Sequence, residues 1–376
     1  MPAPDNSQPP ESITLDKFDG LKNTLSKERM GPADLVTAVN VDIDDASQIS
    51  RRRGRTQVAT GNFHSPFTTN FGKVLIVKDG MLSLLYPDYT AQSIVPIIGS
   101  DPSEGERPLA YVQIGGTVYY SGASDSGKVD LASFTASPWG DDPDLWLSPV
   151  VDPTATLAPV AGKLLGKPPN ATAMDYFSGR IYLANDKTLW VTELYAYDFV
   201  DKNAGYKYFE APITMVAAVS DGVFVGTEEG LWFLSGPSFA QMKRRRVMDS
   251  PVIPGSVVSV PGELGNPPQV GLQADTPVQV SVMFMTATGI CVGGDGGQTT
   301  NLTESKFFFP AAVSAAALYR RQDGANAYVA VTQNGGTPSN TAAIGDYVDA
   351  VLIRRDTWRE ACDRVFVTDR FTTVWS

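Results

Sequence analysis

The chain has 376 residues, of which 43% are hydrophobic and 19% charged, and its formal net charge is −11. This composition fits one large or two ordinary globular domains and excludes a protein whose whole surface attracts nucleic acid. Two cysteines, Cys291 and Cys362, are too few for a disulfide framework. The sequence contains neither a secretory signal nor an apolar run of the roughly 20 residues needed to cross a bilayer, so we expect synthesis in the cytoplasm and no membrane span.

The N-terminal part of the sequence predicts an arm, a short strand and a basic segment. We expect residues 1–36 to form an N-terminal arm whose first dozen or so residues are flexible. Residues 38–44, AVNVDID, and a turn then precede the basic segment, which contains Arg51, Arg52, Arg53 and Arg55. Clustered arginines beside a strand favour contact with an acidic face of another subunit or with DNA phosphates.

The middle of the chain repeats itself. Residues 179–193, GRIYLANDKTLWVTE, recur 42 residues later as DGVFVGTEEGLWFLS, residues 221–235, so that Trp190 falls on Trp232 without a gap. Each copy has the pattern of a β-meander with tight turns. In the second copy we expect strands over 215–219, 223–227 and 231–235, and we expect Gly222 to supply a positive φ in the first turn.

Further copies of this pattern occur elsewhere in the chain. Residues 116–122 match the first copy at an offset of 63, and residues 288–298 match the second at an offset of 67. Looser relatives lie at 74–86 and 317–331. Forty-two residues is the length of a four-stranded propeller blade, and the longer offsets are that period plus insertions. The repeats therefore predict an all-β fold, a β-propeller of about five to seven blades with loop insertions. A β-sandwich or a solenoid explains the period less well.

The predicted propeller covers residues 37–376, with insertions near 134–160 and 236–275. The second insertion should protrude, because it is rich in proline and glycine and carries a basic cluster. That cluster consists of Lys243, Arg244, Arg245 and Arg246. In an acidic chain it is a second candidate for contact with another subunit or with DNA, as are the pairs Arg320–Arg321 and Arg354–Arg355. Ordinary solvated turns are the alternative interpretation for each cluster.

Motifs that could carry catalysis are weak. Residues 122–129, GASDSGKV, satisfy G-x-x-x-x-G-K, but Val129 stands where a phosphate-binding loop needs Ser or Thr, and no helix pattern follows. His64 is the single histidine in the sequence, which leaves a histidine-based triad or zinc site without partners. Cys291 aligns with aromatic positions of the repeats, so we expect a buried hydrophobe, and a structural role is favoured for Cys362. We expect no catalytic residue, cofactor or metal.

Paired carboxylates leave one alternative open, because some propellers are glycosidases. The pairs in this sequence are Glu228–Glu229 and Asp141–Asp142, with a third group in NVDIDD. The carboxylates of that group are Asp42, Asp44 and Asp45. Carboxylates in turns are normally solvated, and DIDDASQISRRR lacks the glycine and the closing glutamate of a calcium-binding loop. A carbohydrate-binding or glycoside-hydrolase propeller is therefore the alternative function.

Residues 18–58 carry a resemblance to known proteins. The stretch that begins Phe18-Asp19-Gly20, continues with AVNVDID and ends in RRRGR resembles the opening of nozzle and hub proteins of short-tailed bacteriophages. The resemblance implies a structural virion protein, a homo-oligomeric ring in the phage tail. It also implies other tail proteins as partners, namely the portal or adaptor ring and fibres. Such a ring would be made in the host cytoplasm, make passing contact with DNA and carry no catalytic residues. A cellular scaffold propeller is a third hypothesis.

Overall fold

The computed structural model describes most of the chain. The described residues are 15, 17–22, 24–36, 41–43, 48–51, 63–98, 108–140, 163–260, 280–304, 312–322, 325–333, 347–355 and 364–368. They form strands almost throughout, with three short 3-10 turns at Lys27–Arg29 (η1), Phe239–Gln241 (η3) and Asp295–Gly297 (η4). None of the helical turns in these ranges has the length and hydropathy needed to cross a membrane.

Within the described residues, six antiparallel sheets of at least four strands follow one another along the chain, and we number them 1 to 6. Sheet 1 contains β5 (Phe63–Thr68), β6 (Val74–Lys78), β7 (Met81–Leu85) and β8 (Ala91–Pro96). Sheet 2 contains β9 (Ala110–Ile114), β10 (Thr117–Ser121), β11 (Ser126–Asp130) and β12 (Thr135–Pro138). Sheet 3 contains β13 (Leu165–Gly166), β14 (Ala173–Phe177), β15 (Arg180–Asn185), β16 (Thr188–Glu193), β17 (Ala196–Asp201) and β18 (Tyr206–Tyr208). Sheet 4 contains β19 (Ile213–Val219), β20 (Gly222–Thr227), β21 (Leu231–Ser235) and β22 (Lys243–Met248). Sheet 5 contains β23 (Val258–Val260), β24 (Ser281–Thr286), β25 (Gly289–Gly294) and β26 (Gln298–Asn301). Sheet 6 contains β27 (Ser314–Gln322), β28 (Ala325–Gln333), β29 (Tyr347–Arg355) and β30 (Arg364–Thr368).

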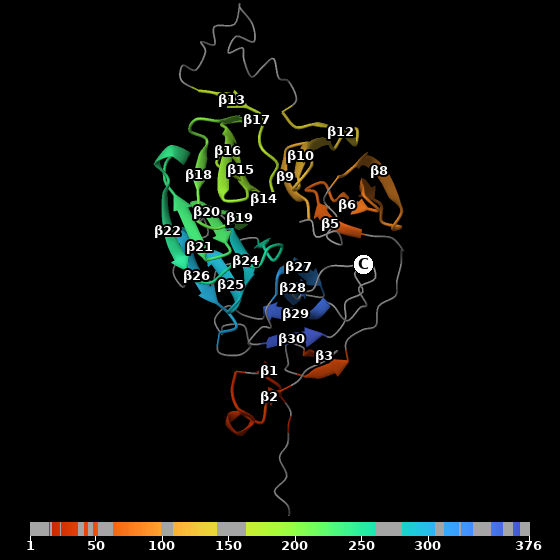
Figure 1. The fold of residues 1–376 in the computed structure, drawn as a ribbon. Coiled ribbons are helices and arrows are strands. Elements are labelled where there is room, and N and C mark those ends of the chain that lie inside the picture. The colour runs from red at the N-terminus through yellow and green to blue at the C-terminus, as the bar shows by residue number, and fades with distance from the viewer. Residues whose placement is uncertain are drawn as a thin grey trace, which may run out of the picture.

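The sheets are arranged as the blades of a propeller. They succeed one another around a common centre (Figure 1), and β14 of sheet 3 lies against β9 of sheet 2 and β19 of sheet 4. Five clusters of buried apolar side chains each combine residues of two consecutive sheets, from the pair 1–2 to the pair 5–6. A single sheet cannot bury both of its faces, so these shared cores hold the fold together. The prediction of an all-β propeller of about five to seven blades is confirmed.

The sequence repeats correspond to equivalent strands of the blades. Counted from the edge strands β14 and β19, β15 and β20 are the second strands of sheets 3 and 4. The third strands β16 and β21 bring Trp190 and Trp232 to matching positions. The prediction of a positive φ at Gly222 is wrong, because Gly222 is not among the residues with that conformation. A side chain is excluded there for another reason: an added Cβ would lie 2.5 Å from the Leu234 carbonyl oxygen.

The predicted insertions begin inside the blades. The segment near 236–275 first forms η3 and then β22, the outermost strand of sheet 4, with Phe239 and Met242 buried. The segment near 134–160 first forms β12, the outermost strand of sheet 2. Loop composition concealed these strands, because an outer strand needs few apolar side chains. Residues 141–162 and 261–279 lie outside the described residues.

The N-terminal region lies outside the six sheets. β1 (Gly20–Leu21) and β2 (Asp34–Leu35) form a two-stranded parallel sheet, and β3 (Val41–Ile43) and β4 (Ile49–Arg51) form an antiparallel hairpin. Both β1 and β3 lie against β30 of sheet 6 (Figure 1). The predicted arm over 1–36 therefore includes a segment that packs on the propeller, and the first described strand of sheet 1 is β5, which begins at Phe63.

Candidate interaction surfaces

The second basic cluster lies on β22, the outer edge of sheet 4. Lys243, Arg244, Arg245 and Arg246 are consecutive and exposed. Because successive side chains of a strand point to opposite faces, Arg244 and Arg246 face sheet 3, while Arg245 faces sheet 5. Charged side chains on an edge strand also hinder pairing with strands of other molecules. Their position alone therefore gives these residues a structural role.

The two arginines that face sheet 3 share one aromatic ring. The guanidinium carbons of Arg244 and Arg246 lie 5.2 and 5.7 Å from the centre of the Trp232 ring. Arg244 also donates hydrogen bonds to the Tyr208 carbonyl (2.9 Å) and to the Glu210 carboxylate (3.1 Å). Both acceptors belong to the end of sheet 3, so Arg244 joins two blades. Cation–π contacts of this kind contribute about 0.5–1 kcal/mol each at exposed sites.

Arg245 makes the corresponding connection to sheet 5. Its guanidinium donates to the carbonyl of Gly296 in η4. The backbone N–H of Gly296 donates in turn to the Asp221 carboxylate (2.8 Å), and the Ser220 N–H donates to Asp295 (3.3 Å). The side chains of Arg245 and Asp221 in sheet 4 thus bind the carbonyl and the N–H of Gly296 in sheet 5. The arginines of β22 are engaged within the chain, whereas Lys243 is simply exposed at the end of the strand.

The first basic cluster has different surroundings. Arg51 ends β4, and all three side chains of this strand are exposed, including Ile49 at 37%. Among the described strands, β4 pairs with β3. Arg52, Arg53 and Arg55 lie outside the described residues. Arg320, Arg321, Arg354 and Arg355 fall on β27 and β29 of sheet 6.

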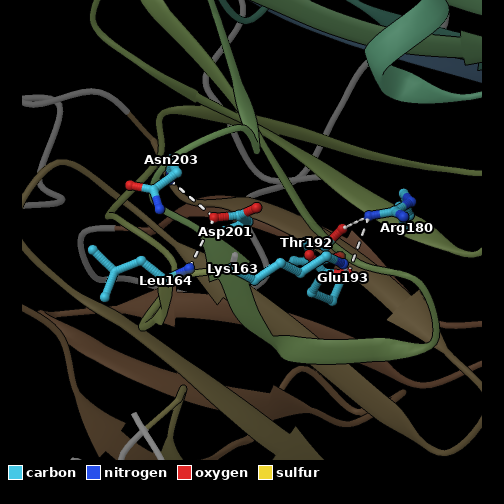
Figure 2. Close-up of polar contacts among 7 residues, drawn as sticks. All are labelled: Lys163, Leu164, Arg180, Thr192, Glu193, Asp201 and Asn203. Atoms are coloured by element: carbon cyan, nitrogen blue, oxygen red, sulfur yellow. Dashed lines mark hydrogen bonds and ion pairs between the residues drawn. The ribbon is translucent and has the colours of Figure 1, made fainter. Parts of the chain in front are cut away.

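A polar cluster at the outer side of sheet 3 was not predicted. Figure 2 shows the Glu193 carboxylate between two cations: the Lys163 Nζ lies 2.6 Å away and the nearer Arg180 nitrogen 3.9 Å. Arg180 also donates to the Thr192 carbonyl at 2.6 Å. Nearby, the Asp201 carboxylate accepts the backbone N–H groups of Leu164 and Asn203 at 3.2 and 2.9 Å (Figure 2). These bonds fix the start of β13 against β17.

Glu193 is the residue before an unusual hairpin tip. β16 and β17 are joined by a two-residue turn, because Glu193 pairs with Ala196. Such turns favour glycine or asparagine, yet the two residues here are Leu194 and Tyr195. Tyr195 adopts a φ of 56° and its ring is 73% exposed. Its backbone N–H donates to the Gly179 carbonyl at 2.9 Å, which ties this tip to the neighbouring turn of the same sheet.

More aromatic residues surround the tip. The Tyr197 ring lies 6.2 Å from the Tyr176 ring and 5.9 Å from the Tyr119 ring of sheet 2. Loss of hydration raises the pKa of Tyr197 to about 12, and the hydrogen bond with Tyr176 and the nearby Tyr195 act in the same direction. The Tyr197 phenol is therefore neutral at physiological pH. The sequence signal for this site was the pair Leu-Tyr at a position where the hairpin spacing demands turn residues.

Lys128 belongs to the joint between sheets 2 and 3. It lies on β11, in a hairpin without a helix, and its Nζ binds both Asp198 oxygens at 3.0 and 3.1 Å. The Trp139 indole donates to the Tyr197 carbonyl at 2.9 Å beside it. Asp198 is available because β17 bulges between its pairings with Thr192 and Glu193. The lysine of the G-x-x-x-x-G-K pattern, Lys128, thus forms an ion pair with Asp198 that connects sheets 2 and 3.

Asp175 is the carboxylate with the clearest shift in pKa. It lies on β14, and its oxygens accept the N–H groups of Tyr176 and of Ala218 in sheet 4, both at 2.7 Å. Burial raises its pKa to about 6, against these two hydrogen bonds. The pair Glu228–Glu229 lies apart from it, in the turn between β20 and β21. Asp141, Asp142, Asp44 and Asp45 lie outside the described residues, and Asp42 is on β3.

The remaining candidates are structural. Cys291 lies on β25 in the core shared by sheets 4 and 5, which confirms the expected buried hydrophobe, and burial raises its pKa to about 12. The Nδ1 of His64 lies 2.9 Å from the Ser65 hydroxyl. That hydroxyl accepts the Leu109 N–H, so it belongs to the joint between sheets 1 and 2. Cys362 lies outside the described residues. In the described ranges, no group of three or more His, Cys, Asp or Glu side chains is placed to hold a metal ion.

Comparisons with known proteins identify no relative by sequence. No family model and no curated protein matches the chain. Similar solved structures include the Pan2 WD40 domain of Neurospora crassa (12% identity, 82% of this chain and 79% of that chain, TM-score 0.38). Hsv2p of Kluyveromyces lactis is 10% identical, and the match covers 85% of this chain and 88% of that chain with a TM-score of 0.39. PorZ, a surface component of the type-IX secretion system of Porphyromonas gingivalis, is 12% identical, and the match covers 86% of this chain and 40% of that chain with a TM-score of 0.36. The chain thus matches well under half of PorZ. Because these TM-scores are low, the assignment of the fold depends on the arrangement of the six sheets alone.

Proposed function

We propose that the chain is a structural virion protein, a ring-forming component of a bacteriophage tail without catalytic activity. The observation that carries this proposal is the position of the β3–β4 hairpin. Its strands belong to the stretch 18–58, which resembles the opening of tail nozzle and hub proteins, and the hairpin lies outside all six blades with its outer strand exposed. A segment of this kind is available to contact a neighbouring subunit.

The blades favour a binding role over turnover. Their prominent charged groups connect one blade to the next: Lys128 to Asp198, and Arg244 to Glu210. Asp175, whose raised pKa would suit an acid catalyst, holds β14 against β19 through the Ala218 N–H, and its second oxygen accepts the N–H of Tyr176 in its own strand. A glycosidase needs two carboxylates about 5–10 Å apart around its substrate. Asp175, Asp198 and Glu210 instead connect neighbouring blades, which favours the structural function.

The proposal names partners and a location. The ring would contact the portal or adaptor ring on one side and fibres on the other, and it would be assembled in the host cytoplasm. Its net charge of −11 would limit adhesion of DNA that passes through the tail. Arg51, Arg52, Arg53 and Arg55 would bind an acidic neighbour at short range.

The test is the location of the chain in a lysate of the cells that produce it. Particles are separated by density, and each fraction is analysed by mass spectrometry. We expect the chain to sediment with DNA-filled particles at a constant ratio to the portal protein. Recovery of the chain in particle-free fractions alone would contradict the proposal. Genes for portal, adaptor or fibre proteins beside its own gene would support it independently.

A further inference from the structure

We propose that the outer side of sheet 3 binds single-stranded nucleic acid through stacked bases and phosphate contacts. The surface consists of two tyrosines of β18, one ring of β16 and two lysines, and we call it the β18 surface: Tyr206, Tyr208, Trp190, Lys202 and Lys207. This activity goes beyond the proposed tail function and does not depend on it. The argument has three parts: the spacing of the exposed rings, the charge of the two lysines, and the contrast with the acidic remainder of the chain.

The two tyrosines lie on the same face of β18. Tyr206 and Tyr208 are separated by one residue, so the alternation of a strand places their side chains on one face, about 7 Å apart. Their exposed fractions are 45% and 60%. Trp190 on β16 pairs with Tyr206 and supports its ring, with 5.0 Å between the ring centres. Successive bases of an extended single strand are separated by a similar distance, so two of them can stack on the two tyrosines.

Lys202 is fixed at the Trp190 end of this surface. Its Nζ lies 4.9 Å from the centre of the Trp190 ring and donates to the Lys167 carbonyl at 2.7 Å. The stem packs on Gly166, where an added Cβ would lie 2.8 Å from the Lys202 Cε. The carboxylate of Asp201, the preceding residue, accepts backbone N–H groups instead. An ammonium group has three N–H donors, so Lys202 keeps donors for a phosphate.

Lys207 brings a second positive charge to the same strand. Its Nζ lies 4.9 Å from the centre of the Phe239 ring, on the face of β18 toward sheet 4. Burial lowers the pKa of Lys207, and the positive charge of Arg244 acts in the same direction. The Glu210 carboxylate nearby is bonded to Arg244. Among the described residues neither Lys202 nor Lys207 forms an ion pair, so a bound anion would balance charge that the chain leaves unbalanced.

The contrast with the rest of the chain selects the ligand. The net charge is −11, so a polyanion is repelled by most of the surface and is retained only where positive charge and further contacts coincide. A duplex covers its base faces by its own stacking, and a plain polyanion has no ring to stack. A single strand offers both phosphates and free base faces. β18 lies beside β22 along the outer side of the molecule (Figure 1), and the hydrogen bond from Arg244 to the Tyr208 carbonyl connects the two strands.

The experiment measures binding of labelled oligothymidine of about eight nucleotides to the full-length chain by fluorescence anisotropy. Tyr208→Leu removes a stacking ring, and we expect the dissociation constant to rise about tenfold. Tyr208→Phe keeps the ring and should stay within about twofold of the wild type. The matched control is Tyr195→Leu, because Tyr195 is 73% exposed on the same sheet but lies beside the balanced pair Lys163–Glu193.

The phosphate contacts are tested by the dependence on salt. Lys202→Met should reduce the slope of the logarithm of the binding constant against the logarithm of the salt concentration by about 0.7, the value for one phosphate of a single strand. Lys73→Met is the control, because Lys73 is an exposed lysine of sheet 1, and it should leave this slope unchanged. Circular dichroism and urea unfolding verify that every variant is folded.

Each opposite result overturns the inference in a different way. Wild-type chain that leaves oligothymidine unbound at concentrations up to about 1 mM overturns it outright. Tighter binding of a duplex, or equal binding of inorganic polyphosphate by the wild type and Tyr208→Leu, overturns base stacking. An equal loss in the Tyr195 or Lys73 control overturns the location. Sedimentation of the chain with DNA-filled particles is independent of all these results, so failure here leaves the phage-tail proposal standing.

Discussion

The two basic segments of this chain, on β22 and at the end of β4, differ in what surrounds them. β22 is the fourth strand of a blade, and its arginines bind Glu210, Gly296 and the Trp232 ring within the same chain. β4 belongs to a hairpin outside the blades, and its side chains are exposed. Similar compositions therefore support different roles, because an arginine contributes to association only where its own chain has not already bound it.

The comparison makes a general prediction. Changes at the joints between blades should lower the free energy of unfolding and leave assembly intact in the folded fraction. Changes at the hairpin should leave the free energy of unfolding nearly unchanged and weaken assembly. Each variant below is therefore measured in two ways, by urea unfolding and by sedimentation.

The largest effect is expected from Trp232→Ala. The ring contacts Phe209 at 6.2 Å and lies beneath two guanidinium groups, so its removal opens a cavity and leaves Arg244 and Arg246 without their support. We expect a loss of about 3 kcal/mol in the free energy of unfolding. Trp190→Ala is the matched control, because Trp190 occupies the equivalent position but contacts a single cation, Lys202. An equal or larger loss at Trp190 would contradict the role assigned to the β22 arginines.

Asp175 predicts a dependence of stability on pH. Its folded pKa of about 6 lies above the ordinary value of 3.8, so the native chain binds this proton more tightly than the unfolded chain does. The resulting stability is fully present below pH 4 and is lost as the pH rises through 6. Relative to Asp175→Asn, the wild type should lose up to about 3 kcal/mol between pH 4 and pH 7. The measurement is urea unfolding of both proteins at several pH values, and a constant difference between them would contradict the assignment.

Gly222→Ala tests the close contact between β20 and β21. A Cβ at this position would lie 2.5 Å from the Leu234 carbonyl oxygen, and backbone cannot move aside easily. We expect a loss of about 2 kcal/mol, within the usual range for overpacking. Gly116→Ala is the control, because Gly116 lies in the turn between β9 and β10 and has no atom within 4 Å of the added Cβ. Equal effects of the two substitutions would show that chain entropy, and not the contact, requires glycine at 222.

The sequence predicts the blades well for a physical reason. Strands β15, β16, β20 and β21 have apolar side chains facing shared cores, so the same pattern recurs wherever the same packing recurs. The sequence places the outer strands β12 and β22, and also β23 at the start of sheet 5, in insertions, because the composition around these strands is that of a loop. The extra strand β18, which pairs with β16, extends sheet 3 beyond the pattern of the repeat.

The surfaces were harder to predict than the fold. Clustered arginines are visible in the sequence, but whether they are engaged depends on groups far along the chain. Arg244 meets Glu210, 34 residues away, and Arg245 meets Gly296, 51 residues away. The cluster around Glu193 draws Lys163 from 30 residues away. Partners at such separations follow from the arrangement of blades, which a local pattern does not encode.

A smaller effect is expected from Arg244→Met. The substitution removes an ion pair with Glu210 that is partly exposed on both sides, and it keeps part of the packing on Trp232. We expect a loss below about 1 kcal/mol, measured by urea unfolding at low and high salt. Lys243→Met on the same strand is the control and should change the free energy of unfolding by no more than about 0.3 kcal/mol. A larger effect at Lys243 would mean that the charge of the strand matters more than its specific bonds.

Arg51→Ser should have the smallest effect on stability and a clear effect on assembly. Its side chain is exposed at the end of a hairpin that lies outside the blades, so the free energy of unfolding should stay within about 0.5 kcal/mol of the wild type. If the hairpin binds the acidic body of another copy, the loss of one cation should weaken association several-fold, and the effect should shrink as salt rises. Arg244→Met, which removes the same charge from a bonded site, should leave association unchanged. If both substitutions weakened association equally, net charge would control assembly, and the distinction between the two basic segments would not hold.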